Sequence, residues 1–228
     1  IRDYLNMNNK KTIIKYILII NMFILGACGI IYEYVLGALA NHLMGSTYEQ
    51  IFIIIGLMMF MMGFSAQFQR KIDFNLYDIF LFTEISLALV GGLSASFIYW
   101  VYISLEHYLI IMYLIVALIG FFIGLEIPII MRINENYANS LKINLSQLLS
   151  MDYIGSLAGA LIFVYVFLAY VPTTQISIIL GILNISVAFI SFLIGLSLVK
   201  FKKTFIIISC SILGILITSF FFVEDWNK

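Results

Sequence analysis

Four acidic side chains interrupt the apolar segments of this sequence and are its first candidates for chemistry. They are Glu33, Glu84, Glu126 and Asp152, and one basic residue, Arg132, follows Glu126 by six positions. An ionisable side chain inside an apolar membrane segment costs about 2.5–3.5 kcal/mol on insertion scales, so such residues are functional candidates by default. Buried carboxylates at this spacing could line a pocket for a cation or relay protons.

The densest group of charges lies in residues 124–160. Here Glu126, Pro128 and Arg132 end one apolar segment, and Asp152 begins the next. Proline lacks the backbone N–H that would close its own helical turn, and an interrupted turn in a membrane helix can face polar backbone toward a cavity. We therefore take this stretch as the centre of the candidate site.

A structural interpretation of the same charges stays open beside the functional one. In that interpretation Glu126 or Asp152 pairs with Arg132, and Glu33 hydrogen-bonds to a polar side chain of a neighbouring helix. Asp152 is also placed where it could cap the start of a helix. Around a helix Glu126 stands about 200° from Gly124, so these two residues are expected to face different neighbours.

No pattern for a catalytic centre or a metal site accompanies the acids. Cys28 and Cys210 lie in apolar runs without a CxxC or Cys/His spacing, which argues against a disulfide framework or zinc. His42 and His107 fall in short predicted loops and are expected to be solvated. The sequence therefore predicts no catalytic residue, no metal ligand and no cofactor in this chain.

The composition indicates an integral membrane protein. Of the 228 residues, 63% are hydrophobic and 11% are charged, and the mean hydropathy is +1.10. A typical soluble domain has about 25% charged residues, and a soluble fold could not bury this much apolar surface. The formal net charge of zero argues against a nucleic-acid partner.

Seven apolar segments are long enough to cross a bilayer, which needs about 20 residues each. In hydrocarbon each segment must satisfy its own backbone hydrogen bonds, so all seven are predicted to be helices in an all-α membrane bundle. The longest loop is expected at about residues 133–148. The predicted segments are 13–39, 50–67, 76–100, 109–131, 149–171, 174–199 and 204–223.

The basic residues predict the orientation of the chain, because cytoplasmic loops carry an excess of Lys and Arg. If the spans alternate, eleven of the twelve basic residues fall on one side, and only Lys228 lies opposite. The protein is therefore predicted to lie in the inner, or cytoplasmic, membrane, with its N-terminus in the cytoplasm. The predicted domains are a cytoplasmic tail (1–12), a seven-helix transmembrane domain (13–223) and a C-terminal tail (224–228). With this orientation Glu84, Glu126 and Asp152 reach the cytoplasmic third, where they could meet.

Small residues recur at helical spacing and predict where helices approach closely. Membrane helices pack through such residues because lipid supplies no hydrophobic drive between them. The sixth segment carries a similar stripe that includes Gly181, Asn184 and Ala188. The predicted packing glycines are Gly29, Gly37, Gly120, Gly124, Gly155 and Gly159.

Several blocks of sequence, in order, resemble one known family. They are GACGIIYEYVLG at residues 26–37, LMGS at 43–46, GLEIPIIMR at 124–132, MDYIGSLAGA at 151–160 and GILN at 181–184. Together they are similar to the membrane segment of transmembrane spermidine synthase-like proteins, which are membrane polyamine aminopropyltransferases.

The resemblance implies a membrane bundle that precedes a Rossmann-like catalytic domain. In the family that domain binds decarboxylated S-adenosylmethionine and transfers its aminopropyl group to putrescine. The present sequence has no glycine-rich cofactor loop after a strand, so no catalytic residue is carried over and the chain alone is expected to be inactive. Seven spans with an inside N-terminus would also place a following domain outside the cytoplasm.

Three functions follow as hypotheses. In the first, the bundle binds or presents a polyamine to a Rossmann-like domain in cis or in trans, with the buried acids as ligands for a polycation. In the second, it is a small-cation or polyamine transporter, or a proton-coupled exporter. In the third, it is a structural anchor or assembly module. The expected partners are the lipid bilayer, a polyamine, the catalytic domain and further copies of the chain.

Overall fold

The computed structural model describes residues 2–45, 48–71, 75–135, 137, 140–196 and 198–226, and these residues form helices and short connections without a strand. The all-α prediction is therefore confirmed. The long helices are α1 (Arg2–Met44), α2 (Tyr48–Phe68), α3 (Leu76–Ser104), α4 (Tyr108–Glu135), α5 (Leu141–Ile162), α7 (Thr173–Ile194) and α8 (Lys202–Trp226).

Three short elements complete the described chain. A single 3₁₀ turn, η1 (Gln69–Lys71), extends the end of α2. A π-helical segment, η2 (Phe163–Phe167), and a last turn, α6 (Leu168–Tyr170), extend α5. Counting these extensions, seven helices in the described residues are long and apolar enough to cross a membrane. Their number agrees with the seven predicted segments.

The predicted long loop at residues 133–148 is wrong. Helix α4 continues through Glu135 and α5 already begins at Leu141. Hydropathy misplaced these ends because the last turn of α4 and the first turns of α5 are polar yet helical. The side chain of Ser140 caps α5 by accepting a hydrogen bond from the backbone N–H of Ile143 at 3.3 Å.

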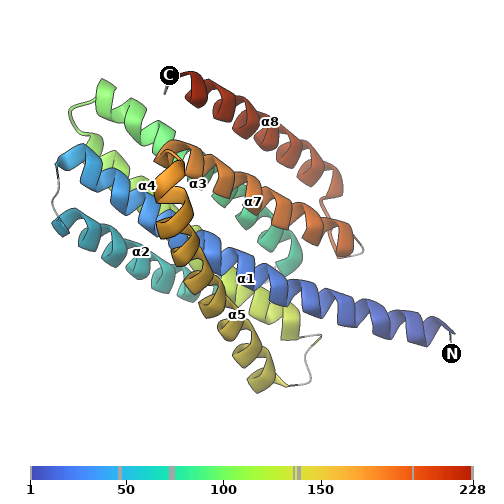
Figure 1. The fold of residues 1–228 in the computed structure, drawn as a ribbon. Coiled ribbons are helices and arrows are strands. Elements are labelled where there is room, and N and C mark those ends of the chain that lie inside the picture. The colour runs from blue at the N-terminus through green and yellow to red at the C-terminus, as the bar shows by residue number, and fades with distance from the viewer. Residues whose placement is uncertain are drawn as a thin grey trace.

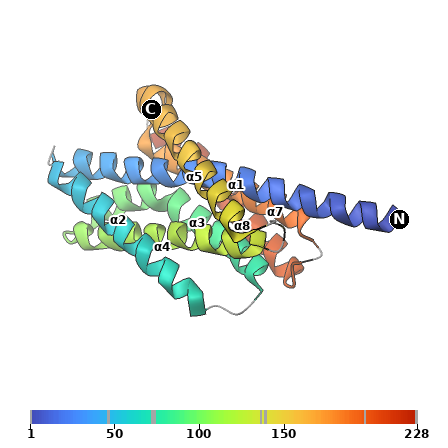
Figure 2. The ribbon, with the colours of Figure 1, turned by 90° about the horizontal axis from the view of Figure 1, so that it is seen from below.

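The helices pack around α1, which crosses the middle of the bundle (Figure 1). Helix α1 packs against α2, α5 and α7, while α4 packs against both α2 and α3. Helix α5 lies across α1 at an oblique angle in both views (Figures 1 and 2). Helix α8 packs against α7 and α3 on the opposite edge of the bundle.

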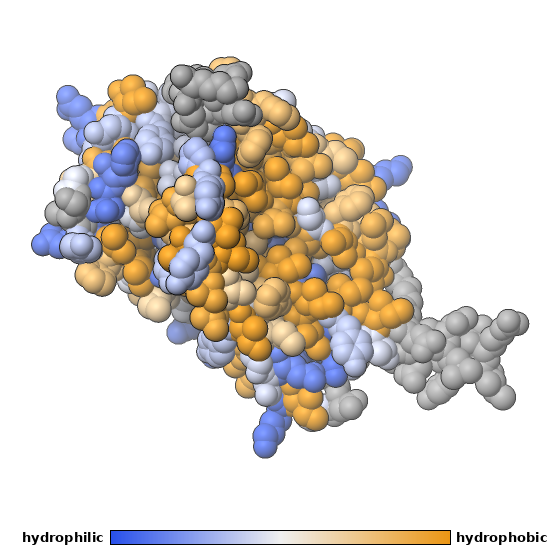
Figure 3. Space-filling model, in the orientation of Figure 1, coloured by the Kyte–Doolittle hydropathy of each residue, from blue (hydrophilic) through white to orange (hydrophobic). Residues whose placement is uncertain are grey.

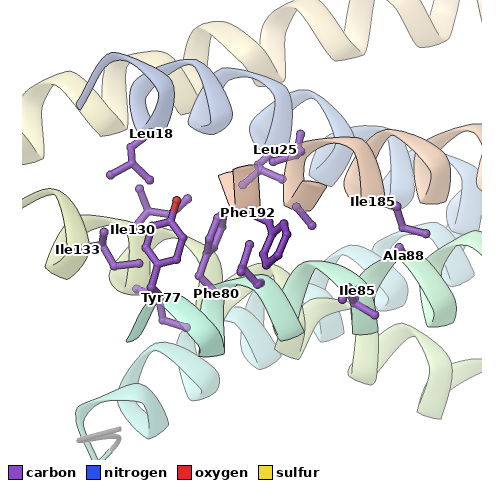
Figure 4. Close-up of a cluster of buried hydrophobic side chains, with 14 of the residues drawn as sticks. Leu18, Leu25, Tyr77, Phe80, Ile85, Ala88, Ile130, Ile133, Ile185 and Phe192 are labelled. Carbon is purple, nitrogen blue, oxygen red and sulfur yellow. The ribbon is translucent and has the colours of Figure 1, made fainter. Parts of the chain in front are cut away.

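Two apolar clusters fill the bundle, one at each end. The first joins the early part of α1 and α3 to the late part of α4 and α7, as Leu18, Phe80, Ile130 and Phe192 illustrate (Figure 4). The second joins the late part of α1 and α3 to the early part of α2, α4 and α7. Successive helices therefore alternate in direction through these elements.

The outward surface of the bundle is strongly apolar. Hydrophobic residues cover most of the middle of the face shown in Figure 3, with the most hydrophilic residues toward its edges. For example, Tyr153 and Leu157 on α5 and Tyr165 on η2 are each more than 60% exposed. A surface of this kind suits contact with lipid, in which exposed apolar side chains carry no cost.

The predicted glycines differ in how closely they approach their neighbours. A Cβ atom at Gly155 would overlap the carbonyl oxygen of Phe23 on α1, and one at Gly159 would lie 2.6 Å from that of Ala27. Gly120 and Gly124 meet the backbone of Met58 and Met62 on α2 in the same way.

The other two predicted packing glycines are less crowded. At Gly29 and Gly37 an added Cβ would meet only side chains of Ile123 and Ile51, at 3.5 and 3.6 Å. These are ordinary contact distances, so the two residues do not require glycine to fit their neighbours.

Candidate functional site: a buried acidic cluster

Glu84 on α3 and Glu126 on α4 form the centre of the candidate site. Glu84 is fully buried and Glu126 is 3% exposed. The two carboxyl groups lie close enough to interact electrostatically. Within the described structure both oxygens of Glu84 and Oε1 of Glu126 lack a hydrogen-bond partner. Buried polar groups are normally hydrogen-bonded, so this pair requires an explanation.

The local sequence explains how these two side chains reach the interior. Glu84 shares one face of α3 with Ala88, Gly91 and Ala95, and this small-residue face packs inward. Glu126 lies on the face of α4 away from Gly124, which faces α2. This arrangement agrees with the angular separation of about 200° expected from the sequence.

Asp152 on α5 lies beside the pair. It interacts electrostatically with Glu126, and a Cβ atom at Gly26 of α1 would lie 2.7 Å from its Oδ1 atom. One turn further along α5, the hydroxyl of Ser156 donates to the carbonyl oxygen of Gly26 at 3.1 Å. Because α5 begins at Leu141, Asp152 is three turns inside this helix, and its interpretation as a helix N-cap is wrong.

Two uncharged polar residues complete the cluster. Tyr32 of α1 and Asn184 of α7 are both fully buried, and the amide Nδ2 of Asn184 donates to the hydroxyl of Tyr32 at 3.4 Å. The Tyr32 ring lies against Gly91, where a Cβ atom would come within 2.8 Å of the hydroxyl. Tyr32 also interacts electrostatically with Glu84 and Glu126.

These residues lie at one depth in the bundle. Glu84 is eight residues from the start of α3, and Glu126 is nine residues from the end of α4. Asn184 is ten residues from the end of α7. At 1.5 Å per residue they lie about 12–15 Å from the same end of the bundle, which is about a third of the length of α3 and of α4. The cluster therefore lies nearer to the end of the bundle at which α3 begins and α4 ends.

Glu33 and Arg132 are not shown in contact with this cluster. Glu33 lies on the late part of α1 and is 9% exposed. Among the described residues, burial is the one influence on its carboxyl group, and no charged neighbour contributes. Arg132 stands about 120° from Glu126 around α4. Its Nη1 atom donates to the carbonyl oxygen of Gln69 at the end of α2, at 3.4 Å.

Sequence reasoning missed Tyr32 and Asn184 as members of the site. The sequence places Asn184 in a stripe of small residues and in the GILN block of the family resemblance, but neither pattern assigns it to a site. Tyr32 carried no signal, because an aromatic residue in an apolar run is ordinarily part of the core. The thiol of Cys28, one turn before Tyr32, also lies close to both glutamates.

The cluster is rich in hydrogen-bond acceptors. Carboxylate oxygens and the free carbonyl Oδ1 of Asn184, which has no partner among the described residues, can accept but not donate. Two carboxylates held together in a low-dielectric interior repel one another unless a proton or a cation neutralises them. The arrangement can therefore bind positive charge. The described residues contain no group of three or more His, Cys, Asp or Glu side chains arranged for a metal ion.

The fold and the site together define an all-helical protein with seven potential membrane spans and an acidic interior. Over 171 residues the chain is 34% identical to the polyamine aminopropyltransferase of Leptospira interrogans, a match that covers 75% of this chain and 34% of that protein. It is 31% identical to polyamine aminopropyltransferase 2 of Ralstonia nicotianae over 175 residues, covering 75% of this chain and 34% of that protein. The chain is also 31% identical to polyamine aminopropyltransferase 1 of Streptomyces coelicolor over 174 residues, a match that covers 75% of this chain and 32% of that protein.

The chain thus spans about a third of the length of the curated relatives it matches. Their shared name supports the relationship inferred from the sequence blocks. No family model matches the chain, and no solved structure gives a significant match.

Proposed function

We propose that this chain is a membrane domain of the polyamine aminopropyltransferase family and that its role is to bind a polyamine and present it to a catalytic domain. It crosses the cytoplasmic membrane seven times with the N-terminus inside. The catalytic domain is Rossmann-like and acts in cis or in trans. Aminopropyl transfer belongs to that domain, since the matched region is about a third of each relative.

The observation that carries this proposal is the buried acidic cluster. Putrescine and spermidine are elongated cations, and Glu84, Glu126 and Asp152 supply anionic groups from three different helices. Ionisable groups are retained inside membrane bundles where they serve a substrate or ion pathway. Glu33, which follows Tyr32 on α1, is the fourth anionic ligand in this proposal. Arg132 tunes or closes the site.

Binding of radiolabelled putrescine and spermidine to the purified chain tests this function. We expect saturable binding that falls at least tenfold in Glu126→Gln and also falls in Glu33→Gln, because each change removes one anionic ligand while preserving side-chain shape. Size-exclusion chromatography checks that both variants fold. Undiminished binding in both folded variants would contradict the proposed set of ligands.

A second function, transport of a polyamine or small cation coupled to protons, is favoured by one feature. Two helices near the acids are irregular: α4 contains Pro128 and α5 passes into the π-helical segment Phe163–Phe167. Interrupted helices beside buried charges are typical of transporter binding sites at the bilayer midplane. Uptake of labelled spermidine into proteoliposomes, dependent on a pH gradient, would favour transport over presentation.

A further inference from the structure

The buried side chain of Asn184 adds an uncharged hydrogen-bonding group to the acidic cluster. Its Nδ2 atom is used by Tyr32, and its Oδ1 atom has no hydrogen-bond partner within the described residues. Asn184 comes from α7, which carries none of the predicted acids. A fully buried carbonyl oxygen without a donor costs about 1–3 kcal/mol, so packing alone does not explain it. Tyr32, the partner of Asn184, lies within electrostatic range of Glu84 and Glu126, which connects Asn184 to the acidic cluster.

The polar groups around Asn184 are complementary to one kind of ligand. Both carboxyl oxygens of Glu84, the Oε1 atom of Glu126 and the Oδ1 atom of Asn184 are acceptors without donors in the described structure. A primary ammonium group carries three N–H donors and a positive charge, as the lysine side chain does. One such group would satisfy these acceptors and neutralise the carboxylates together.

We infer that Glu84, Glu126, Asn184 and Tyr32 form a single interior site that binds one terminal ammonium group of an alkyl amine. This inference rests on the proposed polyamine function and narrows it to particular atoms. The carboxyl groups supply the negative charge and Asn184 Oδ1 accepts one N–H. Tyr32, held by Asn184 and by its seat against Gly91, positions the amide.

The site lies between the two apolar clusters of the bundle. Leu125, Ile85 and Ile185 belong to the first cluster, while Tyr32 and Leu180 belong to the second. Apolar side chains line the bundle on both sides of the site. The site therefore holds a single ammonium group of a polyamine. Since Glu84 and Asn184 are fully buried, the ligand enters when neighbouring helices separate.

The structure makes a prediction that separates a ligand site from packing between helices. If the polar groups serve an absent ligand, replacing one by an apolar residue of similar size removes an unsatisfied buried group and stabilises the empty protein. If they join helices, the same change destabilises it. We therefore propose Glu84→Met and Asn184→Leu as test variants, with Tyr32→Phe to remove only the hydroxyl.

Asp78→Asn is the matched control, because Asp78 is a buried acid on the same helix that is fully partnered. It is 4% exposed, and its carboxylate accepts from the side chain of Asn75 and the backbone N–H of Lys200 at 2.9 and 3.0 Å. The unfolding temperature of detergent-purified protein is measured with and without 1-propylamine, putrescine or spermidine, and with sodium chloride at equal ionic strength.

The inference predicts that all three amines, and not sodium, raise the unfolding temperature of the unaltered protein. Glu84→Met should unfold at a higher temperature without amine, because both oxygens of Glu84 lack a partner among the described residues. Glu84→Met and Asn184→Leu should each lose at least tenfold in amine affinity. Tyr32→Phe should lose affinity less, and Asp78→Asn should unfold earlier while keeping its response to amines.

Two results would overturn the inference in distinguishable ways. If the unaltered protein responds to amines and the Glu84 and Asn184 variants respond equally well, the site is elsewhere and the polyamine function stands. If the unaltered protein binds no amine, both proposals fail. A stabilising response to sodium alone would assign the cluster to a metal cation and likewise overturn the ammonium site.

Discussion

The buried polar side chains of this protein fall into two kinds, satisfied and unsatisfied. Asp78, Asn21 and Asn144 each make short hydrogen bonds across elements. Glu84 and Asn184 keep acceptors without donors among the described residues. A missing partner alone does not mark a functional position, because Gln69, Ser96, Asn134 and Gln147 each also have one such atom. Glu84 differs from these four in being a fully buried ionisable group.

The satisfied kind supports a direct stability prediction. Asn134 of α4 donates to Asn144 of α5 at 2.7 Å, and Asn144 donates to the carbonyl oxygen of Met131 at 2.9 Å. Both asparagines are fully buried. We expect Asn144→Leu to lower the free energy of unfolding by about 1–3 kcal/mol, because Asn134 and the Met131 carbonyl both lose a partner.

Reversible unfolding in mixed micelles measures this change, with the exposed Ser146→Ala as a control that should alter stability by less than about 0.5 kcal/mol. Equal free energies of unfolding for the Asn144 and Ser146 variants would show that the hydrogen bond between Asn134 and Asn144 does not stabilise the contact of α4 with α5.

At the scale of elements, the glycines determine which helices meet. Gly155 and Gly159 let the backbone of α5 approach that of α1, and Gly120 and Gly124 do the same between α4 and α2. The approach of α5 to α1 also places Asp152 near Glu126. The site therefore depends on helix contacts that lie one to two turns away from it.

We expect Gly155→Ala to destabilise the protein by more than about 2 kcal/mol, because the added methyl group overlaps the backbone of Phe23. Gly56→Ala is the control, since no atom lies within 4 Å of its added Cβ. In a helix interior that change should stabilise by up to about 1 kcal/mol. Unfolding temperatures of the two variants compare them directly. Similar values would refute close packing of α5 on α1.

At the scale of the whole molecule, the alternating helices bring the basic ends together. The turn η1, which extends α2, ends in Arg70 and Lys71, near the end of α4, as the contact of Arg132 with Gln69 shows. Lys142 lies in the first turn of α5, and α8 begins at Lys202. Because the helices alternate in direction, these basic segments lie at the same end of the bundle. Their position supports the proposed cytoplasmic N-terminus, since cytoplasmic segments carry an excess of Lys and Arg.

Cysteine labelling tests this orientation in cells. In a background of Cys28→Ala and Cys210→Ala, we expect His107→Cys, in the exposed turn between α3 and α4, to react with a membrane-impermeant maleimide from outside. Lys142→Cys, which is exposed at the start of α5, should react only after the membrane is permeabilised. The reverse pattern would invert the topology, and labelling of both from outside would contradict the seven-span arrangement.

The sequence by itself determined the helical class, the seven apolar segments and the acids that interrupt them, because hydropathy and charge are properties of each segment taken alone. It could not determine that Asp152 lies three turns inside α5, since the polar residues before it read as a loop. Only the tertiary structure decided that Glu84, Glu126, Tyr32 and Asn184 lie together. The reason is that the meeting of side chains depends on the rotation and crossing of packed helices, which no single segment encodes.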